Sequence, residues 1–178
     1  DEGSPGRDWN VATGMVIEGK AGFQIMGDWA KGEFTAAGKV PGVDYYCAAT
    51  PSNNGYLYNV DSFIFYKSSD PDKQAGQKLL AKLMMGKNFQ KVFNLYKGSI
   101  PARLDVSMDE FDKCAKTSNA DIKTAGAKGG LVPSFAHGMA QGNTMKAALQ
   151  DIITEHFNSD MSSVDAANAL ADSVLANM

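Results

Sequence analysis

Five side chains spread along the sequence are of the types that bind a small polar molecule without altering it. They are an aromatic ring, an amide, a carboxylate, an amine and an imidazole, carried by Trp29, Asn59, Asp61, Lys97 and His137. A sugar presents a weakly polar C–H face and a rim of hydroxyls. An aromatic plate suits the face, and planar or charged hydrogen-bonding groups suit the rim. The residue types therefore predict a binding site for such a ligand, provided that the fold gathers them.

The segment before Trp29 predicts a helix, a tight turn and a short buried strand. The helix, with Asp8 as its N-cap and Gly19 as its stop, is marked by apolar residues at helical spacing: Trp9, Ala12, Met15 and Val16. The strand that follows is marked by a second apolar set: Ala21, Phe23, Ile25 and Met26. Ligands in open α/β sheets lie beyond the carboxyl ends of strands, so Trp29, after Gly27-Asp28, would stand at a binding cleft. A tryptophan buried in the core is the alternative.

Asn59 and Asp61 open a second predicted strand, over residues 59–66, which is apolar enough at its end for burial on both faces. Side chains two apart on a strand point to one face, so the amide and the carboxylate would act together. Asn can donate and accept, whereas Asp accepts from two hydroxyls. The alternative is that both residues cap the turn after Asn54-Gly55.

Lys97 ends a predicted amphipathic helix, and His137 stands in a loop. The helix is marked by four apolar residues: Phe89, Val92, Phe93 and Tyr96. Lys97, just before the helix stop at Gly98, could donate to a ligand oxygen, or could serve only as a cation at the negative end of the helix dipole. His137, within Pro-Ser-Phe-Ala-His-Gly, can donate and accept as a neutral imidazole. A structural histidine with satisfied hydrogen bonds is its alternative.

The remaining elements are mostly helical. Asp70 as cap and Pro71 as first helical residue predict a further helix start. Later elements are expected as helices over 107–116, 143–157 and 162–176, with a polar, Gly-rich connection over 117–132. Ser162 and Asp165 would form a capping pair. The whole pattern is mixed α/β, with few strands and a helical C-terminal half.

The composition argues against several other functions. The net charge of the 178 residues is −3 and no basic cluster occurs, which argues against a nucleic-acid partner. No run approaches the roughly 18 apolar residues of a membrane-spanning helix. No G-x-S-x-G or H-E-x-x-H motif occurs, and the two histidines, His137 and His156, have no metal-ligand partner at helical spacing. We expect no cofactor, no metal and no catalytic residue, and a solvated His156.

Four segments together resemble the extracellular solute-binding proteins, family 1, of bacterial ABC importers, and within them the periplasmic glucose/mannose-binding group. The segments are residues 9–30, Asn-Val-Asp-Ser-Phe-Ile-Phe at 59–65, Lys-Gly-Ser-Ile-Pro-Ala-Arg at 97–103 and Pro-Ser-Phe-Ala-His-Gly at 133–138. The resemblance covers essentially the whole chain. It implies an α/β fold of the periplasmic-binding-protein-like type II class, a periplasmic location, and sugar capture without covalent chemistry.

The resemblance also implies that the fold is incomplete here. The resembled proteins are about twice as long and have two lobes, so the chain is expected to be a C-terminal portion. Residues 1–50 would belong to the second lobe, residues 51–100 would cross to the first lobe, and residues 101–178 would complete the second lobe with helices. The missing N-terminal part of the same protein and ABC permease subunits are the expected partners.

The same resemblance implies the ligand and the site. In the glucose-binding group the second part of the chain supplies an aromatic residue, an Asn/Asp pair, a Lys and a His, which matches the five residues above. The expected ligand is a monosaccharide, glucose, held between the lobes. Arg103 matches another recurrent position, which we interpret as interlobe or structural. In an oxidising compartment Cys47 and Cys114 are expected to form a disulfide; two unrelated buried thiols are the alternative.

A second functional hypothesis is a fragment of a carbohydrate-active enzyme such as a glycosidase. Such an enzyme needs two carboxylates across a cleft, about 5–9 Å apart. Asp28 and Asp61 are the candidates. Asp28, beside Trp29, is more simply explained as a turn residue.

Overall fold

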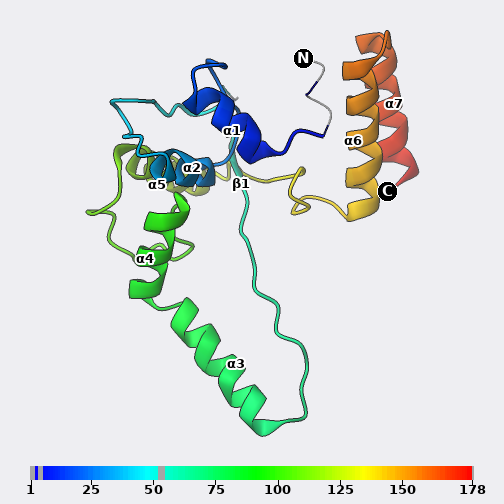
Figure 1. Cartoon of the computed structure of the whole chain (residues 1–178). Coiled ribbons are helices and arrows are strands. Elements are labelled where there is room, and N and C mark those ends of the chain that lie inside the picture. The colour runs from blue at the N-terminus through cyan, green and yellow to red at the C-terminus, as the bar shows by residue number, and fades with distance from the viewer. Residues whose placement is uncertain (1–2, 4–5, 52–54, 178) are drawn as a thin grey trace. The chain divides into compact units, whose positions relative to one another are not determined.

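The computed structural model describes residue 3, residues 6–51 and residues 55–177, so Asn54 of the predicted turn lies outside the described residues. The chain forms two compact units. The first unit comprises Asp1–Asn53 and Ser62–Lys128, and the second comprises Asn54–Asp61 and Gly129–Met178. Helices dominate both units (Figure 1).

The first unit is built from helices joined by long connections. They are α1 (Trp9–Ile17), the 3-10 turn η1 (Asp28–Ala30), α2 (Lys31–Ala36), α3 (Pro71–Met84), α4 (Lys87–Lys97) and α5 (Lys113–Ala127). The predicted first helix is confirmed as α1, and Gly19 adopts the expected left-handed conformation, with φ of 74°. Asp8 occupies the N-cap position, but its side chain makes no capping hydrogen bond.

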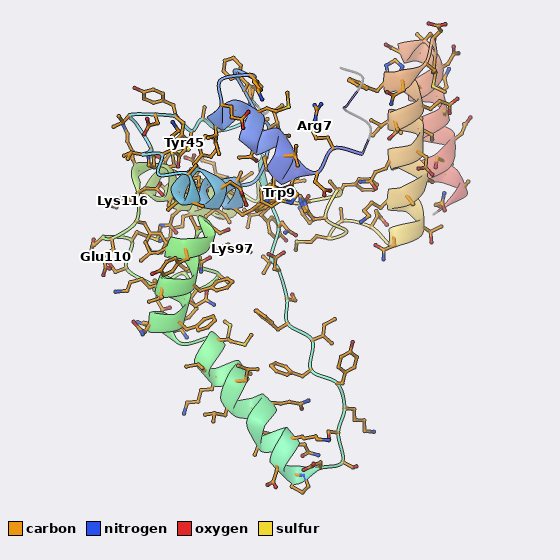
Figure 2. The ribbon with its side chains drawn as sticks, viewed as in Figure 1. Arg7, Trp9, Tyr45, Lys97, Glu110 and Lys116 are labelled. Atoms are coloured by element: carbon orange, nitrogen blue, oxygen red, sulfur yellow. A yellow bond between two sulfur atoms is a disulfide. The ribbon has the colours of Figure 1, made fainter. Side chains whose placement is uncertain are left out.

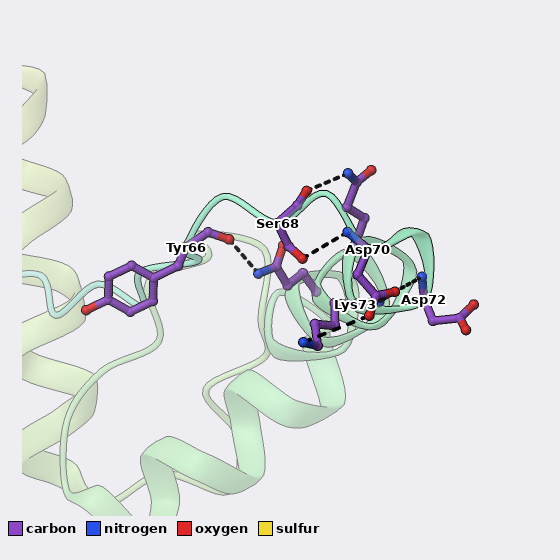
Figure 3. Close-up of polar contacts among 7 residues, drawn as sticks. Tyr66, Ser68, Asp70, Asp72 and Lys73 are labelled. Atoms are coloured by element: carbon purple, nitrogen blue, oxygen red, sulfur yellow. Dashed lines mark hydrogen bonds and ion pairs between the residues drawn. The ribbon is translucent and has the colours of Figure 1, made fainter.

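The start of α3 follows the prediction in detail. The Asp70 carboxylate accepts hydrogen bonds from the backbone N–H of Asp72 at 2.9 Å (Figure 3) and of Lys73 at 3.3 Å. Pro71 is the first helical residue. The side chains of Gln74 and Gln77 then donate to the carbonyls of Ser68 and Tyr66. These bonds fold the preceding segment back onto the first turns of the helix.

A cluster of apolar and polar groups joins α2 to α5. Phe34, Phe111 and Ala115 are buried, and the Phe34 ring stacks on Tyr45 with centroids 4.2 Å apart. A disulfide links Cys47 to Cys114, as the sequence predicts. The unit is therefore tied together covalently across a sequence separation of 67 residues.

An ion pair that the sequence did not reveal lies beside this cluster. Lys31 is only 5% exposed, and its Nζ donates to Asp112 Oδ2 at 2.7 Å. The other carboxylate oxygen of Asp112 accepts from the backbone N–H of Ala115 at 2.8 Å and so caps α5. One carboxylate thereby fixes both α2 and the start of α5.

The second unit combines a small parallel sheet with a helical hairpin. Strand β1 (Tyr56–Tyr58) pairs in parallel with β2 (Leu131–Pro133), with Tyr56 opposite Leu131 and Tyr58 opposite Pro133. Helices α6 (Asn143–Asn158) and α7 (Ser163–Ala176) pack against each other and confirm the last two predicted helices. Ser162 caps α7 by accepting from the Asp165 N–H at 3.1 Å, and its hydroxyl donates to the Asp165 carboxylate, as predicted.

Two predicted strands are wrong. Residues 21–26 and 59–66 are described throughout, and neither forms a strand. Phe23 is 96% exposed and Ile64 is 78% exposed, so the expected burial is wrong as well. An extended segment needs a neighbour that pairs its backbone groups. Within the described residues such pairing is confined to β1 with β2 and an isolated bridge between Pro41 and Tyr45.

The helix expected over 107–116 is displaced toward the C-terminus. Ser107 accepts from the Asp109 N–H at 3.2 Å and donates to the Asp109 carboxylate at 2.7 Å, which fixes a local turn instead of a helix start. Asp112 then supplies the N-cap of α5, which continues to Ala127. Most of the predicted connection over 117–132 is therefore helical.

Candidate functional site

Three of the five predicted binding residues follow the paired strands of the second unit. Parallel strands have their carboxyl ends at the same edge, and Asn59 and Asp61 follow β1 while His137 follows β2. The two connections remain in contact beyond the strands. The Ser134 N–H donates to the Tyr58 carbonyl at 2.8 Å, and the Val60 N–H donates to the Met139 sulfur at 3.1 Å.

Asn59 and Asp61 contact each other directly. The Asn59 side-chain amide donates to Asp61 Oδ1 at 3.1 Å, which brings the two side chains together without a regular strand. A carboxylate only accepts hydrogen bonds, so this contact leaves the Asn59 carbonyl oxygen as an acceptor. The pair thus presents mainly acceptor oxygens, which suit ligand hydroxyls.

His137 is held by a compact turn after β2. The Gly138 N–H donates to the Phe135 carbonyl at 2.9 Å, and the Met139 N–H donates to the Ser134 carbonyl at 3.0 Å. Within this turn Ser134 Oγ lies 2.6 Å from His137 Nδ1. Ser134 is buried and His137 is exposed, so a protected hydroxyl orients an accessible imidazole. The sequence analysis missed Ser134, although a serine three residues before a histidine in a turn was a signal for it.

Trp29 and Lys97 lie on adjoining elements of the first unit. Trp29 is in η1. Lys97, which is labelled in Figure 2, ends α4. Two glycines allow the backbones to approach: a Cβ placed on Gly98 would lie 2.7 Å from the Gly32 nitrogen and 3.1 Å from the Asp28 carbonyl oxygen. The Asp28 carboxylate also accepts from the Ile100 N–H at 3.2 Å. The end of α4 is therefore docked on the turn that carries Trp29.

The Trp29 ring packs over its own chain. A Cβ placed on Gly27 would collide with the six-membered part of the indole, so the absence of a side chain at Gly27 makes room for the ring. Trp29 is half-buried in this position. The burial of Trp29 is therefore intermediate between that of a core tryptophan and that of a fully exposed aromatic plate.

Lys97 adjoins an apolar surface on α4. Its Nζ lies 5.9 Å from the centroid of the Phe93 ring, within reach of a cation–π contact. A shallow hollow on this helix is lined by Phe89, Val92, Phe93, Tyr96 and Lys97. Lys97 also stands where a cation complements the helix dipole, so the dipole alternative and the binding alternative are compatible.

Asp28 has a perturbed acidity. Burial raises the pKa of its carboxyl above the ordinary value, while the positive charge of Lys31 and the hydrogen bond from Ile100 oppose that rise. A raised pKa is one property of a general acid. Asp28 is, however, engaged by the backbone of Ile100 and lies beside the Lys31–Asp112 pair, which is what a structural turn residue would do. Asp28 and Asp61, the two candidates for a glycosidase, belong to different units.

Arg103 forms a local structural contact. Its guanidinium donates two hydrogen bonds of 2.8 Å to Asp105 and one of 3.1 Å to the Met85 carbonyl. His156, expected to be solvated, is half-buried and its Nδ1 lies 2.8 Å from the Met161 carbonyl oxygen. No group of acidic, histidine or cysteine side chains suited to a metal occurs among the described residues.

The chain is similar to curated proteins over nearly its whole length. A "Probable sugar-binding periplasmic protein" of Brucella suis is 48% identical over 98% of the chain, and one of Rhizobium meliloti is 44% identical over 98%. An ABC transporter extracellular-binding protein of Pyrococcus horikoshii is 36% identical over 84%. No protein-family model matches the chain.

The matches cover only part of each relative. The chain spans about 41% of the length of the Brucella suis protein and 42% of the Rhizobium meliloti protein. The names of these relatives confirm the predicted periplasmic location. In the described part of the chain, the helices are too short or too polar to cross a bilayer. The chain is therefore a homologue of part of the periplasmic sugar-binding proteins and of an ABC transporter extracellular-binding protein.

Proposed function

We propose that this chain is the sugar-binding portion of an ABC importer component, which captures a monosaccharide and delivers it to a membrane permease. The observation that carries the proposal is the 44–48% identity to periplasmic proteins named as sugar-binding. The second unit supports it, because Asn59 and Asp61 follow β1 and His137 follows β2, at the carboxyl ends of the two paired strands. In this proposal the protein binds the sugar and releases it without altering it chemically.

We propose a role in sugar binding for each of the five predicted residues. Trp29 would lie against the apolar face of the sugar, and Lys97 would donate to a ring oxygen or a hydroxyl. Asn59, Asp61 and His137 would hold the remaining hydroxyls. Glucose is the proposed ligand, since these residue types match those that the glucose/mannose-binding group uses.

We further propose that the chain acts within a longer, two-lobed protein of the type II class. The large apolar surface of the first unit supports this, because large exposed apolar patches mark interaction sites. Leu79, Leu80 and Leu83 on α3 are 46–70% exposed, and the Phe63–Tyr66 run before α3 is exposed as well. Residues 51–100 would cross to the first lobe, and residues 1–50 and 101–178 would belong to the second.

The experiment is calorimetric titration of the full-length protein with glucose, mannose, galactose and xylose. Glucose should give saturable binding, and His137→Ala should weaken it while His156→Ala should not. An aryl glycoside should be neither bound covalently nor hydrolysed. Absence of binding to every sugar would contradict the proposal, and turnover of the glycoside would favour the enzyme hypothesis instead.

A further inference from the structure

Ser134 is buried and is held by hydrogen bonds of its backbone, although it lies in a loop. It is 2% exposed, its N–H donates to the Tyr58 carbonyl at 2.8 Å, and its carbonyl accepts from the Met139 N–H at 3.0 Å. The backbone of Ser134 is therefore fixed both by the last residue of β1 and by the turn after β2. Its oxygen lies 2.6 Å from His137 Nδ1.

The direction of this hydrogen bond follows from burial. A buried hydroxyl hydrogen needs an acceptor, since leaving it unsatisfied is costly. The acceptor that the structure places beside Ser134 Oγ is His137 Nδ1. A neutral imidazole carries one ring hydrogen, so an accepting Nδ1 leaves that hydrogen on Nε2.

We propose that Ser134 is a positioning residue that fixes His137 as the tautomer with hydrogen on Nε2, which makes this nitrogen a donor to a ligand oxygen. The inference rests on the proposed function, because it assigns a direction to one contact of that site. Asn59 and Asp61 contribute mainly acceptors at the same edge. A donor beside these acceptors matches a sugar hydroxyl, which accepts one hydrogen bond and donates another.

His156 provides an internal contrast. Its Nδ1 lies 2.8 Å from the Met161 carbonyl oxygen, which only accepts, so in His156 the hydrogen resides on Nδ1. The two histidines of the chain are thus expected to be opposite tautomers. The difference arises because His137 Nδ1 faces a hydroxyl that donates, whereas His156 Nδ1 faces a carbonyl oxygen that accepts.

The test is nitrogen-15 NMR of the imidazole rings in the full-length protein without sugar, at a pH where the rings are neutral. His137 should show an unprotonated Nδ1 and a protonated Nε2, and His156 should show the reverse. In Ser134→Ala the two His137 signals should move toward an average of both tautomers, while the His156 signals stay. Ser163→Ala, an exposed serine of the same unit, is the matched control and should change neither ring.

Glucose affinity is then measured for the same variants by calorimetry. Ser134→Ala should weaken binding by about 2- to 10-fold, the effect of one net hydrogen bond. The positioning role would be overturned if His137 Nδ1 carries the hydrogen in the protein without substitutions. It would also be overturned if Ser134→Ala leaves the His137 nitrogen signals unchanged, or if it changes those signals but leaves the glucose affinity unchanged. If His137→Ala also leaves glucose affinity unchanged, the proposed ligand contact of His137 is what fails. The NMR test of the His137 tautomer does not depend on the affinity measured for His137→Ala.

Discussion

Gly98 is predicted to be the most sensitive glycine of the first unit, because two separate effects oppose a side chain there. Its φ is 88°, and an L-residue in the left-handed region is destabilised by about 1–2 kcal/mol. A Cβ would also lie 2.7 Å from the Gly32 nitrogen and 3.1 Å from the Asp28 carbonyl oxygen. These are backbone atoms, and such overpacking typically adds about 1–3 kcal/mol. Gly98→Ala should therefore lower the free energy of unfolding by about 2–5 kcal/mol.

Gly38→Ala is the matched control for this variant. Gly38 has φ of 71°, but a Cβ there would meet nothing within 4 Å, so its cost should be the backbone strain alone, about 1–2 kcal/mol. Urea unfolding of both variants, followed by far-ultraviolet circular dichroism, measures the difference. Equal destabilisation by the two substitutions would refute the close contact between the end of α4 and the turn that carries Trp29.

Three further predictions concern the ligand plate, the disulfide and a buried phenol. Trp29→Ala should weaken glucose binding by about 1–3 kcal/mol in calorimetric titration, whereas Trp9→Ala should leave it unchanged; equal effects would argue against stacking on Trp29. Cys47→Ser should lower the free energy of unfolding by about 4 kcal/mol in urea, because the disulfide closes a long loop, and an unchanged midpoint would contradict this. Burial and the negative charge of Asp112 raise the pKa of Tyr45 to about 12 from 10.0. The folded state then holds this proton more tightly than the unfolded state, so stability should fall as pH rises from 10 to about 12, and Tyr45→Phe should show a smaller fall.

Helices with local start signals were predictable from the sequence. Asp70 with Pro71, and Ser162 with Asp165, form the expected caps, because capping depends on residues within one turn of each other. The start of α5 was misplaced because Ser107 uses its hydroxyl for a competing turn, so that Asp112 becomes the cap.

Strands were not predictable in the same way. Residues 59–66 have the composition of a buried strand, but a strand also needs a partner, and that partner depends on distant parts of the chain. The contacts of the candidate site were likewise only partly predictable from local sequence signals. Asn59 and Asp61 were expected to share one face of a strand that does not form, and a direct hydrogen bond brings them together instead. The approach of Ser134 to His137 required the turn after β2.

The central claim is that Trp29 and His137 both contact bound glucose in the full-length protein. The direct measurement is a glucose titration of the full-length protein followed by NMR, with the Trp29 indole N–H and the His137 ring as reporters. Both signals should shift and saturate with the same dissociation constant, while the Trp9 indole and the His156 ring stay in place. If only one of the two reporters responds, or if the two saturate at different glucose concentrations, Trp29 and His137 do not contact the same bound sugar.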